Sequence, residues 1–124
     1  MINLKFRAWD KIRKKFHTSA KWVEFIVING ELKAFNFNFN DKEVELPVMQ
    51  YTGLKDKNGV EIYSGDILHH QKQGFLEVRY GNKHFDYAGF TLTNAKGMTN
   101  TLQNSHIYEV VGNIYENKDL INRQ

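Results

Sequence analysis

Glycine residues divide the middle of this 124-residue chain into short β-forming segments, and this punctuation restricts the fold more than any other feature. Between residues 50 and 67, Gly53, Gly59 and Gly65 separate runs such as Val60-Glu61-Ile62-Tyr63. Glycine accepts the positive φ angles that tight turns require, and Asp66 can accept backbone N–H bonds within its own turn. The pattern therefore predicts short antiparallel strands joined by tight turns.

The same pattern continues through the N-terminal half. The run 23–28 is strongly β-forming, and Asn29-Gly30 after it is the preferred pair for a two-residue primed turn, because both positions need positive φ. The return strand, 31–40, alternates asparagines with three phenylalanines, namely Phe35, Phe37 and Phe39. Their rings share one face, which we expect to be buried in the core. If they were exposed, the rings would instead suit stacking on nucleic-acid bases.

Pro47 is the one proline of the chain, and it predicts a strand end, because proline has no N–H for a sheet ladder. We place a boundary here, between an N-terminal β-meander (1–48) and a C-terminal unit (49–124). In the C-terminal unit, glycine turns separate short β-forming runs, which is typical of a small barrel. These runs cover 60–63, 67–70, 75–80, 89–93 and 107–115.

The order of these runs and turns looks like that of an SH3-like barrel. The predicted fold is therefore all-β, an N-terminal β-meander packed with a C-terminal SH3-like barrel. A short tail over 116–122 is expected to form a helical turn, with Asn117 as its cap and Leu120 and Ile121 packed on the barrel.

The composition predicts a soluble protein of a reducing compartment. There is no cysteine, and no apolar run approaches the ~18 residues of a membrane span. The segment Met1-Ile2-Asn3-Leu4-Lys5 lacks the apolar core and the small-residue cleavage site of a signal peptide. We expect a cytoplasmic protein without membrane contact.

Four sequence blocks, in order and spread over nearly the whole chain, resemble the YopX family of phage and prophage proteins. They are Lys5-Phe6-Arg7-Ala8-Trp9-Asp10-Lys11, Met49-Gln50-Tyr51-Thr52-Gly53-Leu54-Lys55-Asp56-Lys57-Asn58-Gly59, Glu61-Ile62-Tyr63-Ser64-Gly65-Asp66-Ile67 and Glu109-Val110-Val111-Gly112-Asn113-Ile114-Tyr115-Glu116-Asn117. The resemblance implies an all-β protein with an SH3-like barrel in its second half, working in the cytoplasm of a bacterial host. It implies no reaction, because it brings no catalytic residues to this chain.

The residues themselves also argue against catalysis and metal binding. His69 and His70 are neighbours on an expected strand, so their side chains face opposite ways. His84 and Asp86 would share a face, but no third ligand lies near them in the sequence. The chain has no nucleophile elbow and no phosphate-binding glycine loop that leads into a helix. We predict no catalytic residue, no metal site and no cofactor, and therefore a protein that is not an enzyme.

Basic residues are concentrated near the N-terminus. Residues 1–22 contain seven lysines and arginines against Asp10 alone, whereas the other 102 residues contain ten basic and thirteen acidic side chains. Within this segment four basic residues follow Trp9 closely, namely Lys11, Arg13, Lys14 and Lys15. Small β-barrels bind nucleic acids with such basic and aromatic clusters, so these four residues are candidate phosphate contacts. A solvated turn accounts for them equally well.

The main functional hypothesis is a non-enzymatic, protein-interaction binding module. Trp9, Tyr51 and Tyr63 are large amphipathic side chains within the four blocks, and they are candidates for an interaction surface. A packing role accounts for them at least as well. The partner would be an unknown host or phage protein, or a second copy paired through strand edges in a homo-oligomer. Nucleic-acid binding through the basic N-terminal turn is the alternative.

Overall fold

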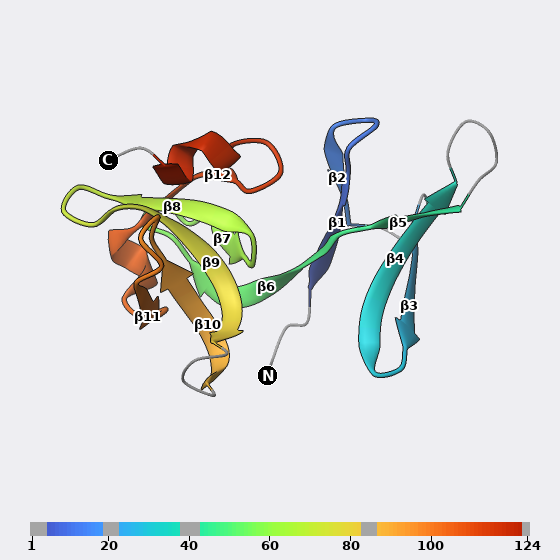
Figure 1. Cartoon of the computed structure of the whole chain (residues 1–124), viewed down its shortest axis with the longest axis horizontal. Coiled ribbons are helices and arrows are strands. Elements are labelled where there is room, and N and C mark those ends of the chain that lie inside the picture. Colours follow the sequence, from blue (N-terminus) through green and yellow to red (C-terminus); the bar gives the residue numbers. More distant parts are fainter. Residues whose placement is uncertain (1–4, 19–22, 38–42, 83–86, 123–124) are drawn as a thin grey trace. The chain divides into compact units, whose positions relative to one another are not determined.

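The structure is a computed structural model that describes residues 5–18, 23–37, 43–82 and 87–122 (Figure 1). These residues form an all-β protein, as predicted. Its helical elements are two short 3-10 helices, η1 (Ser105–Ile107) and η2 (Lys118–Asn122). Within the described ranges, no helix has the length and apolarity needed to cross a bilayer.

The described residues also contain twelve strands. In chain order they are β1 (Phe6–Asp10), β2 (Lys15–His17), β3 (Glu24–Ile28), β4 (Glu31–Phe37), β5 (Glu43–Leu46), β6 (Val48–Lys55), β7 (Glu61–Tyr63), β8 (Asp66–His70), β9 (Gly74–Asn82), β10 (Tyr87–Thr93), β11 (Thr99–Thr101) and β12 (Glu109–Asn113). The chain divides into an N-terminal unit, Lys5–Gln50, and a C-terminal unit that begins at Tyr51. The division falls inside β6.

The N-terminal unit contains two antiparallel arrangements. β1 pairs with β2 on one side and with the first residues of β6 on the other, while β3, β4 and β5 form a three-stranded sheet in that order. The turn between β3 and β4 has φ angles of 53° at Asn29 and 79° at Gly30, which confirms the predicted primed turn. Pro47 lies between β5 and β6, at a strand end as predicted.

The one fully buried described residue of β4 lies on the face opposite the predicted phenylalanine face. Ala34 is fully buried, and it pairs with Phe25 on β3 and with Leu46 on β5. Phe35 lies on the other face and is half-buried, so the predicted phenylalanine face is only partly buried at this position. The reason is tertiary, because Val23 and Leu46 supply the apolar layer on the Ala34 side. The side chain of Phe37 and all of Phe39 lie outside the described residues.

The C-terminal unit is a curled five-stranded antiparallel sheet with strand order β11-β10-β9-β8-β12 (Figure 1). Its core contains Ile62, Leu68, Leu76, Val78, Leu92, Leu102 and Tyr108. β8, β9 and β10 cover the runs predicted over 67–70, 75–80 and 89–93. The run predicted over 107–115 is shorter in the structure, because β12 covers 109–113 and Ile107 belongs to η1. The three-residue strands β2 and β11 were not predicted. The SH3-like assignment of this sheet stays a prediction.

The tail after β12 forms the predicted helical turn, as helix η2. Asn117 contributes differently from the prediction, because its Oδ1 accepts a hydrogen bond from the backbone N–H of Asn113, before the helix. Leu120 and Ile121 are half-buried. The tail is thus fastened to the end of β12 by a side-chain bond.

Candidate functional site

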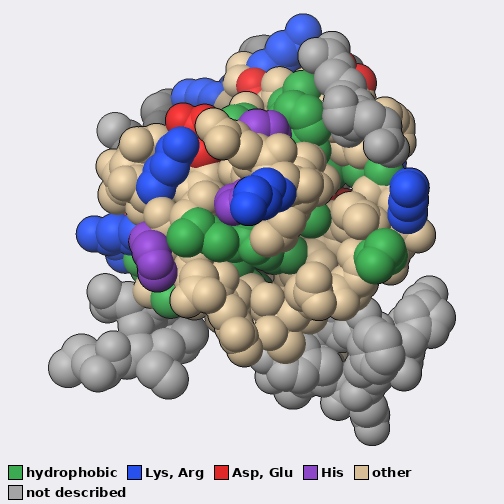
Figure 2. All heavy atoms as spheres, turned by 90° about the vertical axis from the view of Figure 1, so that its left-hand side faces the viewer, with side chains coloured by type: hydrophobic (Ala, Val, Ile, Leu, Met, Phe, Trp, Pro, Cys, Tyr) green, Lys and Arg blue, Asp and Glu red, His purple; other side chains and the backbone are tan. Residues whose placement is uncertain are grey.

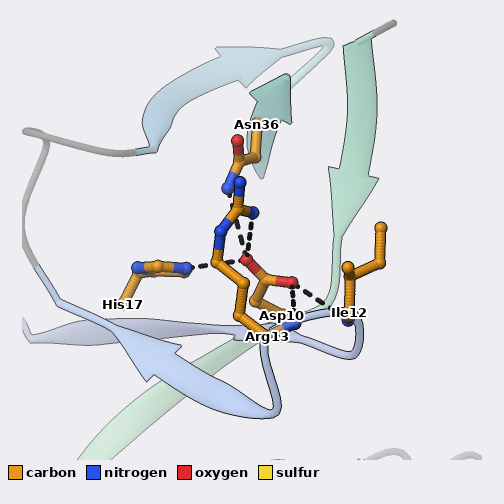
Figure 3. A network of polar contacts seen from close by, with 5 residues as sticks. All are labelled: Asp10, Ile12, Arg13, His17 and Asn36. Carbon is orange, nitrogen blue, oxygen red and sulfur yellow. Dashed lines mark hydrogen bonds and ion pairs between the residues drawn. The ribbon is translucent and has the colours of Figure 1, made fainter. Parts of the chain in front are cut away.

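A buried carboxylate organises the turn between β1 and β2. Asp10, the last residue of β1, is 1% exposed. Its Oδ1 accepts hydrogen bonds from the backbone N–H groups of Ile12 at 3.1 Å and Arg13 at 3.0 Å (Figure 3). An aspartate that accepts from the two or three following residues is a common way to fix a turn. The buried side chain of Asp10, at the start of the turn, therefore fixes the conformation of the turn.

The other oxygen of Asp10, Oδ2, contacts side chains from the turn, from β2 and from β4. Arg13 donates from Nη1 at 2.9 Å, and the ring Nε2 of His17 on β2 lies at the same distance (Figure 3). Asn36 on β4 donates from Nδ2 at 3.4 Å. The pairing of β1 with β2 explains the arrangement, because Asp10 is opposite Lys15, which places His17, two residues on, on the same face.

These contacts keep Asp10 ionised. Burial raises the pKa of this carboxyl group, but the hydrogen bonds from His17 and from the backbone and guanidinium of Arg13 outweigh burial and lower the pKa from 3.8 to about 2. The network therefore holds one permanent negative charge beneath the basic turn throughout the physiological pH range.

A pocket of about 140 Å³ opens beside this network. Among the described residues, its lining contains Arg13, Lys15, His17 and Asn36. Arg13 and Lys15 are positively charged and Asn36 carries amide donors, so the lining suits an anionic group. Asp10 is not part of the lining, because it lies behind the side chains that it binds.

The four predicted nucleic-acid contacts are brought together on this turn. Lys11, Arg13, Lys14 and Lys15 are all exposed, and Lys14 adopts a positive φ of 54°. Sequence reasoning missed that Arg13 is paired with Asp10, and that His17 and Asn36 join the same network. A local signal existed for Arg13, since an aspartate three residues before it predicts a side-chain-fixed turn. No local signal connects Asn36 to this turn.

The three aromatic candidates for an interaction surface are buried. Trp9, Tyr51 and Tyr63 are 6%, 7% and 8% exposed. The ring of Trp9 lies 4.9 Å from that of Phe16, and the rings of Tyr51 and Tyr63 are 5.5 Å apart. This burial favours a packing role for the three rings, and other residues carry the interaction hypothesis below.

The histidines of the C-terminal unit lie against aromatic rings. His69 is 4.8 Å from the ring of Phe75, and His70 is 5.6 Å from that of Tyr108. Among the described residues, no three or more His, Cys, Asp or Glu side chains are grouped in a way that could hold a metal ion. His84 and Asp86, which would share a face of an extended strand, lie outside the described residues.

The surface of the molecule shown in Figure 2 is mixed in character. Basic, histidine and hydrophobic side chains alternate over this face, and its coloured, described part has no continuous basic area.

A second exposed feature lies at the edge of the three-stranded sheet. β3 is an outer strand, and its apolar residues are unusually open: Ile26, Val27 and Ile28 are 36%, 67% and 37% exposed. The other outer strand, β5, carries two exposed carboxylates, Glu43 and Glu45. Charged residues commonly protect a sheet edge from pairing, so the two edges of this sheet differ in character.

Comparison with known proteins places the chain in a family. The crystal structure of protein EF1440 from Enterococcus faecalis is similar, with 28% sequence identity and a TM-score of 0.57 over 98% of this chain and 99% of that one. No curated protein matches the chain. The family model described as YopX protein matches residues 5–122, nearly the full length. The chain therefore belongs to the YopX protein family.

Proposed function

We propose that this protein is a non-enzymatic binding module that contacts another protein chain by strand addition at β3. The observation that carries the proposal is the open apolar edge of the three-stranded sheet. Unprotected edges with apolar side chains are templates for pairing with a further strand. In keeping with the family resemblance, we place this activity in the cytoplasm of a bacterium that carries a phage or prophage.

The backbone of β3 is arranged to accept such a strand. The primed turn at Asn29 and Gly30 is closed by Ile28 and Glu31, and a two-residue turn of this kind is closed by a hydrogen-bonded pair. Hydrogen-bonded and non-bonded pairs alternate along an antiparallel ladder. The N–H and C=O groups of Phe25 and Val27 therefore point away from β4, toward the open edge.

The side chains define which partner fits. Ile26 and Ile28 lie on one face of β3, and Val27 lies on the other, so an added strand would meet apolar side chains on both faces. Glu24 is the one charged residue of the strand. The edge thus selects an extended and largely apolar segment.

The chain itself supplies a strand of this kind, and we propose that the first occupant of the edge is a second copy. In an antiparallel pair centred on Ile26, the outward-pointing N–H and C=O groups of Phe25 in one copy bond to those of Val27 in the other. Glu24 then lies opposite Ile28, so no like charges face each other. Because only five residues pair, the interface is small, and we expect a dissociation constant on the order of 10 µM.

Sedimentation velocity over a concentration series tests this pairing. We expect a monomer–dimer equilibrium for the wild type and a monomer for Val27→Lys, in which a charge is added to the edge. Met98→Lys is the matched control, because Met98 is 66% exposed on a turn of the C-terminal unit. A wild type that stays monomeric at millimolar concentration would overturn the dimer, as would a Val27→Lys variant that dimerises normally.

Amide hydrogen exchange gives a second measurement with an internal control. The amides of Phe25 and Val27 should become protected as protein concentration rises, because pairing with a second copy gives them acceptors. The amide of Ile26 should be protected at every concentration, since it already points toward β4. Equal behaviour of these three amides would contradict the proposed geometry.

The second candidate function is binding of nucleic-acid phosphates by the turn after β1. The observation in its favour is that four basic side chains are exposed together on this turn, namely Lys11, Arg13, Lys14 and Lys15. Fluorescence anisotropy with single-stranded and duplex oligonucleotides over a salt series tests it, and affinity should fall steeply with salt. Lys14→Glu/Lys15→Glu should abolish binding, whereas Lys72→Glu/Lys96→Glu, with the same change in net charge, should not. Absence of binding at low ionic strength would exclude nucleic-acid binding by this turn.

A further inference from the structure

We propose that the pocket beside the Asp10 network binds a phosphoryl group, carried either by a small molecule or by the end of a nucleic-acid strand. This inference is independent of strand addition at β3. It rests on a pocket of about 140 Å³ lined by Arg13, Lys15, His17 and Asn36. Guanidinium, ammonium and amide groups are the side chains that proteins use to hold phosphate oxygens.

The lining side chains come from different elements of the N-terminal unit. Arg13 comes from the turn, His17 from β2 and Asn36 from β4, and they converge around one carboxylate (Figure 3). Lys15 shares the face of β2 that carries His17. A phosphate monoester carries up to two negative charges, whereas a carboxylate ligand carries one. The two positive charges of Arg13 and Lys15 therefore favour the phosphoryl group.

Asp10 positions the side chains of the pocket, and positive charges of the lining offset its negative charge. Its two oxygens receive hydrogen bonds from two backbone N–H groups and from the side chains of Arg13 and Asn36, and they contact the ring of His17. The carboxylate thus lies behind the groups that a ligand would meet. The two positive charges of Arg13 and Lys15 outnumber the one negative charge of Asp10, so the local potential remains favourable to an anion.

The flexible side chains of the pocket are held before a ligand arrives. Arg13 is fixed by Asp10 at 2.9 Å, and His17 is buried with 6% of its surface exposed. Groups that are already ordered lose little conformational entropy on binding. This arrangement distinguishes the pocket from an ordinary cluster of solvated lysines.

Isothermal titration calorimetry with AMP, adenosine and inorganic phosphate tests the proposal directly. AMP should bind at least about tenfold more tightly than adenosine, the effect of one charge-assisted hydrogen bond or more. Inorganic phosphate should compete with AMP. Equal affinities for AMP and adenosine, or no binding of any of the three, would overturn the phosphoryl site.

Paired variants separate the pocket from general electrostatics. Lys15→Gln should weaken AMP binding about tenfold, because it replaces a charged donor of the lining by a neutral one. Asn36→Ala should weaken it about fivefold, because it removes an amide donor. Lys14→Gln removes the same charge from the same turn outside the pocket, and we expect a change of less than about twofold. Equal effects of Lys14→Gln and Lys15→Gln would overturn the pocket. Since Lys15 is exposed, its variant should keep the fold, which circular dichroism checks.

Two oligonucleotides of identical sequence identify the source of the phosphoryl group. If the strand carrying a 5′-phosphate binds more tightly than the strand carrying a 5′-hydroxyl, and Lys15→Gln removes the difference, the ligand is a strand end. If AMP binds and the two strands do not differ, the ligand is a small phosphorylated molecule. Both results support the site, whereas tight binding of both strands with no affinity for AMP would overturn it in favour of backbone contacts.

Discussion

Asp56 accepts a hydrogen bond from the backbone N–H of Val110 at 2.9 Å, across 54 positions of the sequence. The bond is made by Oδ2, while Oδ1 accepts from the N–H groups of Asn58 and Val60 within the turn between β6 and β7. Asp56 is 5% exposed. One buried carboxylate therefore shapes a turn and at the same time fastens it to β12.

The first prediction concerns this fastening. Asp56→Asn keeps the size of the side chain but turns an amide NH2 toward one of the three N–H donors. A buried donor without an acceptor costs about 1–3 kcal/mol, so we expect the free energy of unfolding to fall by about 2 kcal/mol. Urea denaturation measures the loss, and exchange of the Val110 amide should quicken.

Asn58→Ala is the control for the same turn. Asn58 is exposed, and its side chain donates to Glu109 at 3.3 Å on the surface. Removing a surface bond of this kind should change stability by less than about 0.5 kcal/mol. An Asp56→Asn variant as stable as Asn58→Ala would show that the long-range bond contributes nothing.

Turn chemistry made much of the fold predictable. Asn29-Gly30 and Gly65 adopt the positive φ angles that their residue types indicate, and Asp66 accepts the N–H of Tyr63 at 2.8 Å within its turn. Such signals are local, because a positive φ angle selects glycine or asparagine whatever the rest of the chain does. The strand positions could then be predicted from these turns and from the alternation of apolar and polar residues between them.

The face of β4 could not be predicted from the same alternation. A strand with phenylalanines on one face and small or polar residues on the other offers two candidates for the core. Val23 and Leu46 pack on the Ala34 side, and this packing determines that Ala34 is buried. Asn36, two residues after Ala34, lies on the same face of β4, where its side chain contacts Asp10. The candidate site was therefore half predictable: the basic turn from composition, and its polar partners only from strand pairing.

The second prediction concerns a close approach at the end of β12. A Cβ added to Gly112 would overlap the side chain of Asn117, whose Cγ and Cβ would lie 2.7 and 2.8 Å away and whose Oδ1 would be closer still. Asn117 cannot simply turn away, because its Oδ1 accepts the N–H of Asn113. We expect Gly112→Ala to lower the free energy of unfolding by about 1–3 kcal/mol.

A double-mutant cycle checks the cause of that loss. Asn117→Gly removes all three overlapping atoms, so it should destabilise by itself but relieve most of the added effect of Gly112→Ala. The coupling between the two changes should reach about 1 kcal/mol or more in thermal or urea unfolding. Strictly additive effects would mean that the overlap is not what makes glycine necessary at this position.

The third prediction concerns pH and Asp10. The folded pKa of about 2 lies below the unfolded value of 3.8, so ionised Asp10 stabilises the folded state above about pH 4, and this contribution is lost as pH falls toward 2. A difference of this size corresponds to about 2 kcal/mol. Asp10→Asn, which cannot ionise, should therefore be about 2 kcal/mol less stable than the wild type at pH 7.

The difference between the two proteins should shrink as pH falls, because protonation removes the same charge from the wild type. Urea denaturation at pH 7, 4 and 2.5 follows it, and comparing the two proteins at each pH cancels the titration of the other carboxylates. Glu43→Gln removes an exposed carboxylate of the same unit and should match the wild type at every pH. If Asp10→Asn differed from the wild type by the same amount at pH 7 and 2.5, the loss would come from packing, and the charge-assisted network around Asp10 would not be the source of its stabilising effect.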